Sequence, residues 1–312
     1  MNIFLWHVHG SWTTAFVQGV HRYFVPVDAD RSTWGLGRAR TWDWPPNVVE
    51  VDIDQAQDLP VDLVVLQRPE ELGGLAEKWL GGRRPGRDVA CVYLEHNAPQ
   101  GRIAEMIHPA ADRPELRVVH VTPFNDLFWD CGSTPTAVVE HGIVDPGHRY
   151  TGELPHAAVV INEPVRRMRV TGTDLLPRFA HAGPLDLFGI GAAELGGIEH
   201  LDQDQLHDEL ARRRVYVHPV RWTSLGLSLL EAMHLGLPVV AVAAAAVVDA
   251  VPPAAGIVST SVQELVDATR RLLGDPIEAA ERGAAARAGV IARYGLQRFL
   301  SDWNNLIEEV TT

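Results

Sequence analysis

Short runs of β-branched and aliphatic residues recur along the chain, separated by helical or turn-rich stretches. Several runs are apolar at nearly every position, which is typical of strands buried on both faces of a sheet. The pattern therefore predicts parallel sheets covered by helices on both sides. In the first half the predicted strands are Asn2–Val8, Val61–Gln67, Val89–Glu95, Arg117–Thr122 and Thr136–Glu140. In the second half they are Ala157–Asn162, Leu185–Ile190, Val215–Pro219, Pro238–Val242 and Gly256–Ser259.

The clearest predicted helices lie near the C-terminus. Ser261 and Glu264 have the spacing of a capping box, which predicts a helix that begins there and ends at Gly274. The segment 293–312 places its apolar residues on one stripe, so it predicts an amphipathic helix that packs on another surface. Tryptophan, proline and aspartate break any regular pattern between residues 27 and 57, and no element is assigned there.

A change of composition divides the chain near its middle. Proline and glycine cluster between residues 146 and 156, where they separate two predicted strands. The length of 312 residues also suits two domains. We therefore expect two doubly wound, Rossmann-like α/β domains facing a cleft, over 1–150 and 151–292, followed by the helical segment 293–312.

Composition and charge narrow the class of protein. Hydrophobic residues make up 46% of the chain and charged residues 21%, values that are ordinary for globular proteins. The formal net charge of -13 argues against a nucleic-acid-binding protein, because phosphate backbones repel an acidic surface. The two cysteines, Cys91 and Cys131, are too few for a disulfide framework, and Cys91 is expected to be a buried thiol.

No targeting or membrane-spanning segment is predicted. The chain opens on a strand-like run, and its longest apolar stretch, 238–248, is shorter than the roughly 18 residues that cross a bilayer. We therefore expect a soluble, cytoplasmic protein with no integral membrane segment. Peripheral contact with a membrane, through a lipid substrate, stays open.

The stretch 215–240 carries the candidate chemistry. A buried strand leads into the loop 223–226, and a helix follows from about Leu227. Loops at the carboxyl ends of parallel strands are where doubly wound folds bind ligands. Gly226 allows close approach to the backbone, and the helix N-terminus offers free N–H groups to an anion. Glu231, about one turn into the helix, is placed to accept hydrogen bonds from ligand hydroxyls.

This stretch resembles the retaining GT-B glycosyltransferases of family 4, the glycosyl transferases group 1. Their signature is a glutamate, seven residues and a second glutamate, in a context like E-G-F-G-L-x-x-L-E-A-M-A-x-G-x-P-V-V. Thr223 stands at the first glutamate and Glu231 at the second. The other positions in register are Gly226, Leu227, Leu230, Ala232, Met233, Gly236, Pro238, Val239 and Val240.

The resemblance implies roles in binding the donor. In the family the second glutamate holds the nucleotide ribose, a role that passes to Glu231. The first contacts the donor sugar, where this chain has Thr223, and the neighbouring Trp222 is a candidate to stack on the sugar. Contacts to the donor nucleotide and its phosphates are expected at Gly10, Arg166, Arg167, Arg169, Ser224, Leu225, Gly226, Leu227 and Glu231.

The resemblance also implies a phosphate clamp and a cleft histidine. Family members clamp the pyrophosphate with an arginine and a lysine, and here Thr171 stands at the lysine, so the clamp is expected within the arginines of 166–169. His96 matches the cleft histidine and, with Arg166, is expected to be catalytic. Gly10 follows the first strand, where the family has a glycine-rich loop. In the family the final helix crosses back to pack on the N-terminal half.

Each of these residues also has a structural interpretation. Glu231 could complement the helix dipole, the arginines could form a solvated loop, and Trp222 could pack in the core. His7 and His9 share a face of the first strand, and with His96 they could hold a metal ion. GT-B enzymes of this kind need no bound metal, so no metal is expected.

The function implied is that of a metal-independent, hexosyltransferase-like enzyme. It would move a sugar from a nucleotide diphosphate sugar, its co-substrate, to an acceptor with retention at the anomeric carbon, and no cofactor is expected. The acceptor, a small molecule, a glycan or a lipid, is expected to bind mainly in the N-terminal half. Two alternatives stay open: a non-catalytic nucleotide-sugar-binding homologue, which Thr223 supports, and a GT-B-like nucleotide-sugar epimerase.

Overall fold

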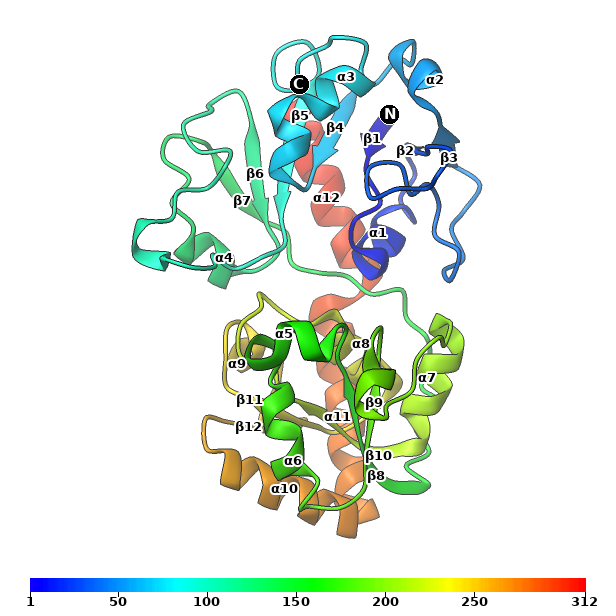
Figure 1. Ribbon diagram of the computed structural model, residues 1–312, viewed down its shortest axis with the longest axis vertical. Coiled ribbons are helices and arrows are strands. Elements are labelled where there is room, and N and C mark those ends of the chain that lie inside the picture. The colour runs from blue at the N-terminus through cyan, green and yellow to red at the C-terminus, as the bar shows by residue number, and fades with distance from the viewer. The chain divides into compact units, whose positions relative to one another are not determined.

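The computed structural model describes all residues from 1 to 312, and they form two compact units (Figure 1). The N-terminal unit comprises Met1–Val144 together with Leu296–Thr312, and the C-terminal unit comprises Asp145–Gly295. These divisions lie a few residues from those at 150 and 292 that the sequence suggests. Asp145 belongs to the C-terminal unit because both of its carboxylate oxygens accept hydrogen bonds from Arg287, at 2.9 and 2.8 Å.

A seven-stranded parallel sheet forms the centre of the N-terminal unit, in the order β3-β2-β1-β4-β5-β6-β7. Its strands are β1 (Asn2–Leu5), β2 (Arg22–Pro26), β3 (Val48–Val51), β4 (Leu63–Leu66), β5 (Ala90–Glu95), β6 (Arg117–His120) and β7 (Thr136–Val138). Its helices are α1 (Gly10–Phe16), α2 (Ile53–Gln57), η1 (Glu71–Leu75), α3 (Ala76–Trp79), η2 (Ile103–Glu105), α4 (Pro123–Phe128) and α12 (Leu296–Thr311). The strand order reverses between β1 and β4, so the carboxyl ends of these strands border the usual ligand crevice of such a sheet.

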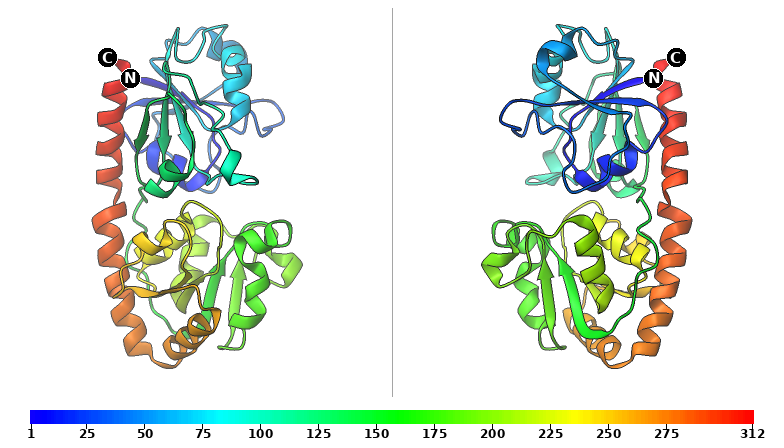
Figure 2. Two further views of the ribbon diagram at one scale, coloured as in Figure 1. Left: turned by 90° about the vertical axis from the view of Figure 1, so that its left-hand side faces the viewer. Right: turned by 90° about the vertical axis from the view of Figure 1, so that its right-hand side faces the viewer.

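Helix α12 belongs to this unit although it follows the C-terminal unit in sequence. Its stripe buries Phe299, Trp303 and Ile307, and the Trp303 ring lies 4.9 Å from that of Phe16 in α1. Figure 2 shows α12 running along the unit, with both chain termini at the same edge. The amphipathic stripe at the end of the chain therefore forms part of the core that holds the first sheet.

A five-stranded parallel sheet, in the order β12-β11-β10-β8-β9, forms the centre of the C-terminal unit. Its strands are β8 (Leu154–Val160), β9 (Leu185–Phe188), β10 (Arg213–His218), β11 (Val239–Val242) and β12 (Gly256–Ser259). Its helices are α5 (Pro164–Thr171), η3 (Thr173–Leu175), α6 (Leu176–Phe179), η4 (Ala192–Leu195), α7 (Gln203–Arg212), α8 (Leu227–Leu235), α9 (Val247–Ala250), α10 (Val262–Gly274) and α11 (Pro276–Tyr294). Here the strand order reverses between β8 and β10.

Alternate residues of the C-terminal sheet pack against helices on its two faces. Val159, Val217 and Val240 share one buried cluster with Leu265 and Leu272 of α10. Helices α8 and α11 cover the opposite face. The predicted class, parallel sheets covered on both sides, is therefore confirmed in each unit.

Two features differ from the sequence prediction. Strands β2 and β3 lie at the edge of the first sheet and were not predicted. The capping box at α10 is only half formed: the Ser261 hydroxyl accepts from the Glu264 amide, but the Glu264 carboxylate accepts from the Ser259 hydroxyl instead of the Ser261 amide. No helix is both long enough and apolar enough to cross a membrane.

Candidate functional site

The candidate donor site lies at the carboxyl edge of the C-terminal sheet, where β10 leads into α8. The chain leaves the strand at His218, passes through a loop containing Thr223, Ser224 and Leu225, and enters α8 after Gly226. The predicted loop and helix are thus both present, with the helix beginning at Leu227. This is the position at which a doubly wound fold presents a helix N-terminus to a ligand.

Gly226 packs directly on the buried ring of His218. A Cβ atom at Gly226 would lie 2.5 Å from Cε1 and 3.0 Å from Nε2 of His218, closer than side chains approach one another. The φ of Gly226 is -72°, so the requirement for glycine comes from this contact and not from the backbone angle. The imidazole therefore sets how closely the start of α8 approaches β10.

Several polar groups beside this helix start have no partner within the protein. Both ring nitrogens of His218 and the hydroxyl of Ser224 are buried without a hydrogen bond. No side chain caps α8, so its first N–H groups are available as well. Burial lowers the pKa of His218 to about 4, which keeps the ring neutral near pH 7. Buried polar groups are normally satisfied, so this cluster is suited to a polar or anionic ligand.

Glu231 is held in place by the preceding helix. Its carboxylate is buried and accepts a hydrogen bond of 3.0 Å from Nε2 of Gln203, and it lies 3.7 Å from Nε2 of His207. Both partners belong to α7, which begins with a capping box between Asp202 and Gln205. Sequence reasoning missed Gln203 and His207 because only the packing of α7 on α8 brings them to Glu231. The carboxylate is therefore oriented before any ligand arrives.

The candidate phosphate-binding arginines differ in their environment. Arg166 forms a two-pronged ion pair with Glu163, three residues before it. Arg169 lies 3.6 Å from the carboxylate of Asp174, which also accepts two hydrogen bonds from Arg221. The charges of Arg166 and Arg169 are thus partly neutralised within the protein.

Arg167 is the exception in this group. Its guanidinium makes no hydrogen bond or ion pair, while its backbone N–H donates to the Glu163 carbonyl in the first turn of α5. Burial lowers the pKa of Arg167, and the neighbouring positive charge of Arg166 lowers it further. A half-buried, unpaired guanidinium after β8 is the group best suited to a phosphate.

Trp222 and Thr223 follow Arg221 in the same loop. The backbone N–H groups of Arg221 and Trp222 both donate to the carbonyl of Val170, near the end of α5, at 2.9 and 3.2 Å. The loop that carries the predicted sugar contacts is therefore tied through its backbone to α5, the helix that carries the predicted phosphate contacts.

A second polar cluster occupies the carboxyl edge of the N-terminal sheet, around His96 after β5. The Gln67 amide donates from Nε2 to the Trp6 carbonyl at 2.7 Å, which leaves its Oε1 to accept from His96 Nε2 at 3.0 Å. His96 therefore carries its proton on Nε2 and presents an unprotonated Nδ1. Gln67, which fixes this tautomer, was not identified from the sequence.

The His96 ring has two further histidines as neighbours. Its centroid lies 4.0 Å from that of His9 and 6.3 Å from that of His141. Burial, reinforced by these two rings, holds the pKa of His96 well below its ordinary value. Burial also lowers the pKa of His141 to about 3. His96 is therefore a neutral hydrogen-bonding group near pH 7, not a cation.

Gly10 and His7 complete this edge of the N-terminal sheet. A Cβ at Gly10, the first residue of α1, would lie 3.2 Å from Nε1 of Trp42 and 3.8 Å from Nε2 of His7. His7 packs its ring against Trp44, 4.8 Å between centroids, and its Nδ1 lies 3.0 Å from the Gly37 carbonyl. No group of three or more histidine, cysteine, aspartate or glutamate side chains is arranged to hold a metal ion.

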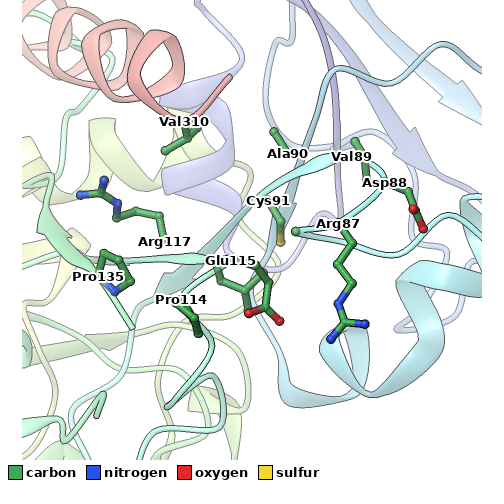
Figure 3. A pocket seen from close by; sticks show the side chains of 12 residues that line it. Arg87, Asp88, Val89, Ala90, Cys91, Pro114, Glu115, Arg117, Pro135 and Val310 are labelled. Carbon is green, nitrogen blue, oxygen red and sulfur yellow. The ribbon is translucent and has the colours of Figure 1, made fainter. Parts of the chain in front are cut away.

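One cavity lies away from both carboxyl edges. It has a volume of about 410 Å³ and lies beside Ala90 and Arg117, the first residues of β5 and β6, with Cys91 and Val310 among its lining (Figure 3). Burial raises the pKa of the Cys91 thiol, so that group is protonated and unreactive. This cavity is at the amino-terminal edge of the sheet and takes no part in the candidate site.

The candidate donor site lies in a segment of the chain that matches a known protein family. Residues 189–275 match the family model described as glycosyl transferases group 1. The matched region begins after β9 and contains the 223–226 loop, all of α8 and Glu231. No curated protein sequence matches the chain.

Solved structures match nearly the whole chain in fold. Sucrose-phosphate synthase from Thermosynechococcus elongatus is 14% identical, with a TM-score of 0.72, covering 99% of this chain and 98% of that one. HepE from Anabaena, in complex with UDP-glucose, is 15% identical with the same TM-score of 0.72, covering 99% and 100%. A glycosyltransferase from Rickettsia africae is 11% identical, with a TM-score of 0.63, covering 99% and 98%. At these identities the likeness shows the fold, so the predicted GT-B class is confirmed.

Proposed function

We propose that the protein is a retaining glycosyltransferase that uses a nucleotide diphosphate sugar as donor. The observation that carries this proposal is the uncapped start of α8, with the unpartnered polar groups of His218 and Ser224 beside it, inside the region that matches the glycosyltransferase family model. A sugar nucleotide supplies both the negative charge that suits a helix N-terminus and the hydroxyls that suit neutral polar groups.

The proposed contacts to the donor are made by charged and polar groups of the C-terminal unit. Glu231, oriented by Gln203, accepts hydrogen bonds from the ribose hydroxyls. The free guanidinium of Arg167 and the N–H groups at the start of α8 bind the diphosphate. As the glycosidic bond breaks, negative charge grows on the leaving phosphate, and these groups stabilise it. Arg166 is already paired with Glu163, so it contributes less to phosphate binding, through its positive charge near the site and not through a direct hydrogen bond.

His96 has a positioning role in this proposal. A neutral imidazole that donates from Nε2 to Gln67 keeps Nδ1 as an acceptor for a ligand hydroxyl at this edge of the N-terminal sheet. Because the pKa of His96 is held well below its ordinary value, the ring is a poor general acid near pH 7. The acceptor's proton then passes to the departing phosphate, and no metal ion or strong general base is required.

A first experiment tests donor binding. Calorimetric titration with nucleoside diphosphates, beginning with UDP because the HepE structure holds a UDP sugar, should detect binding to the parent. Arg167→Ala should weaken binding of the nucleoside diphosphate by about tenfold or more, because a hydrogen bond to a charged group is worth about 1.5–3 kcal/mol. The same substitution should change the affinity for the bare nucleoside far less. Arg166→Ala, the matched control, should have a smaller effect because Glu163 already neutralises that side chain. If no nucleoside diphosphate binds, the proposed function is wrong.

A second experiment addresses Thr223, which replaces the glutamate of the resembled motif. Threonine is shorter and neutral, so it makes a weaker bond to a sugar hydroxyl than a carboxylate, for which about 1.5–3 kcal/mol is typical. We expect the parent to use a donor whose sugar lacks or inverts one hydroxyl, and Thr223→Glu to shift preference toward a fully hydroxylated sugar. The measurement is transfer from a panel of natural nucleotide sugars, including deoxy and epimeric forms. Binding without transfer from any donor would favour the alternative of a non-catalytic nucleotide-sugar-binding protein.

A further inference from the structure

The side chain of Gln203 lies beside the carboxylate of Glu231. Gln203 is the first residue of α7, and its amide Nε2 lies 3.0 Å from Oε2 of Glu231 and 2.7 Å from Nε2 of His207. An amide oxygen in this position would face the carboxylate oxygen with no proton between them, because both atoms are hydrogen-bond acceptors. The amide nitrogen therefore faces Glu231, and it donates one of its two protons to Glu231 and the other to His207.

His207 holds this amide from its other side. It follows Gln203 by four residues, so the two side chains share one face of α7, and the ring is buried. Because Nε2 of His207 accepts a proton from the amide, the ring carries its own proton on Nδ1. The capping box between Asp202 and Gln205 holds the backbone of the same turn. The orientation of the carboxamide is thus determined by Glu231 and His207 together.

The oxygen of this carboxamide is left for a ligand. Oε1 of Gln203 makes no hydrogen bond within the protein, and the protein does not enclose it. The two heteroatoms of a carboxamide share one carbon atom, so Oε1 lies close to the carboxylate that Nε2 contacts. An amide oxygen can accept a hydrogen bond but cannot donate one. This position therefore favours a ligand group that carries a proton.

The adjacent hydroxyl groups of a ribose fit this pair of acceptors. A carboxylate can accept several hydrogen bonds, so Glu231 can bind one ribose hydroxyl while it accepts from Gln203. The neighbouring hydroxyl then has Oε1 of Gln203 as its acceptor. A sugar that lacks either hydroxyl would cover one of these acceptors and leave it without a partner, which is more costly than exchanging one hydrogen bond for another.

We propose that Gln203, positioned by His207, is a specificity-determining residue that selects ribonucleotide donors over deoxyribonucleotide donors. This inference rests on the proposed function and names the class of donor, a nucleoside diphosphate sugar with an intact ribose diol. Glu231 supplies one acceptor for the diol and Oε1 of Gln203 supplies the second. Gln203 binds the ribose and not the reacting atoms, so its effect is on donor affinity.

The experiment compares nucleotides that differ by one hydroxyl. Calorimetric titration is done with UDP, 2′-deoxy-UDP and 3′-deoxy-UDP, or with the same three forms of another base if the donor screen selects one. Each deoxy form should bind the parent about tenfold or more weakly than UDP. In Gln203→Leu, UDP should bind about fivefold more weakly, the usual effect of one neutral hydrogen bond. The preference for UDP over one of the two deoxy forms should fall by a similar factor.

A glutamine at the start of another helix provides the matched control. Gln263, in the first turn of α10, also donates from Nε2 to a carboxylate, that of Asp267 at 3.2 Å, and it is exposed. Gln263→Leu should keep both the affinity for UDP and the preference for the intact diol.

The positioning role of His207 has two readouts of its own. His207→Leu removes the acceptor for the amide and should lower the preference for UDP, whereas His207→Gln offers a new acceptor and should retain most of it. In the absence of nucleotide, nitrogen NMR of the His207 ring should show the proton on Nδ1 in the parent. The His207 signal is identified by its loss in His207→Gln.

The outcomes separate this inference from the proposed function. Equal binding of all three nucleotides to the parent, or an unchanged preference in Gln203→Leu, would overturn the inference and leave nucleotide binding in place. A His207 ring protonated on Nε2 would also overturn it, because the amide oxygen would then face the ring instead of the ligand. If no nucleoside diphosphate binds to the parent at all, the proposed function is wrong and this inference is wrong with it.

Discussion

Gly226→Ala is expected to destabilise the C-terminal unit by about 1–3 kcal/mol, the usual cost of forcing extra volume into a packed site. The added methyl group would lie 2.5 Å from Cε1 of His218, whose ring is buried and cannot withdraw into solvent. The start of α8 must then move away from β10, taking with it the N–H groups that face the candidate ligand. We therefore also expect affinity for nucleoside diphosphates to fall by about tenfold or more, since a charged hydrogen bond contributes about 1.5–3 kcal/mol.

Two controls isolate the contact as the cause. Gly274→Ala places its methyl group in open space at the end of α10 and should leave both stability and nucleotide affinity close to those of the parent. His218→Ala removes the ring that the new methyl group would strike, so Gly226→Ala should cost less in that background. The measurements are urea unfolding and calorimetric titration. An equal cost of Gly226→Ala with and without the imidazole would show that the contact does not limit α8.

The repeated strand pattern was the most informative part of the sequence. Ten of the twelve strands follow from apolar runs, because strands buried on both faces allow few polar positions. The two that were missed are β3, at the edge of the first sheet, and β2, next to it. β2 begins with an arginine and ends with a proline, and β3 contains Glu50. An edge strand such as β3 need not be apolar throughout, and the arginine and proline at the ends of β2 leave only a short apolar run, so both strands merge with the irregular chain around them.

The candidate site could be predicted only where it is local in sequence. The loop 223–226 and the start of α8 follow from neighbouring residues, and so does the position of Glu231. Contacts that join distant elements, such as Gln203 to Glu231 or Gln67 to His96, have no local signal. One departure from the expected site, the ion pair between Arg166 and Glu163, could have been anticipated from the sequence.

That difference concerns the arginines after β8. Glu163 and Arg166 are three residues apart at the start of a helix, a spacing that favours an ion pair. Reading this spacing from the sequence would have moved the phosphate-binding role toward Arg167. Its free guanidinium is a property of the folded C-terminal unit, because it depends on which carboxylates the neighbouring side chains reach.

Mild acid is expected to destabilise the N-terminal unit strongly, because several of its histidines are buried in the neutral form. Burial lowers the pKa of His120 to about 4 and that of His141 to about 3, and it holds the pKa of His96 well below its ordinary value. In the unfolded chain these groups titrate near 6.5. Their contribution to stability is therefore complete above about pH 6.5 and is lost as the pH falls toward their folded values, because only the unfolded state takes up protons in that range.

The size of the effect can be estimated from the difference in proton uptake. Between about pH 7 and about pH 5.5 each such histidine should lower the free energy of unfolding by about 1 kcal/mol, so three of them lower it by about 3–4 kcal/mol. Glu71 acts in the opposite direction, since burial raises the pKa of its carboxyl. One such group does not offset three histidines.

Urea unfolding followed by tryptophan fluorescence measures this loss of stability in the N-terminal unit. Eight of the nine tryptophans belong to the N-terminal unit, and only Trp222 belongs to the other. His120→Leu should make the stability of this unit less dependent on pH, because it removes one group that takes up a proton on unfolding. His181→Asn, at an exposed histidine of the C-terminal unit, should leave that dependence unchanged. A free energy of unfolding that stays constant between neutral and mildly acidic solution would mean that these histidines are protonated, and therefore hydrated, in the folded protein. His96 could then no longer be a neutral hydrogen-bond acceptor at the edge of the sheet.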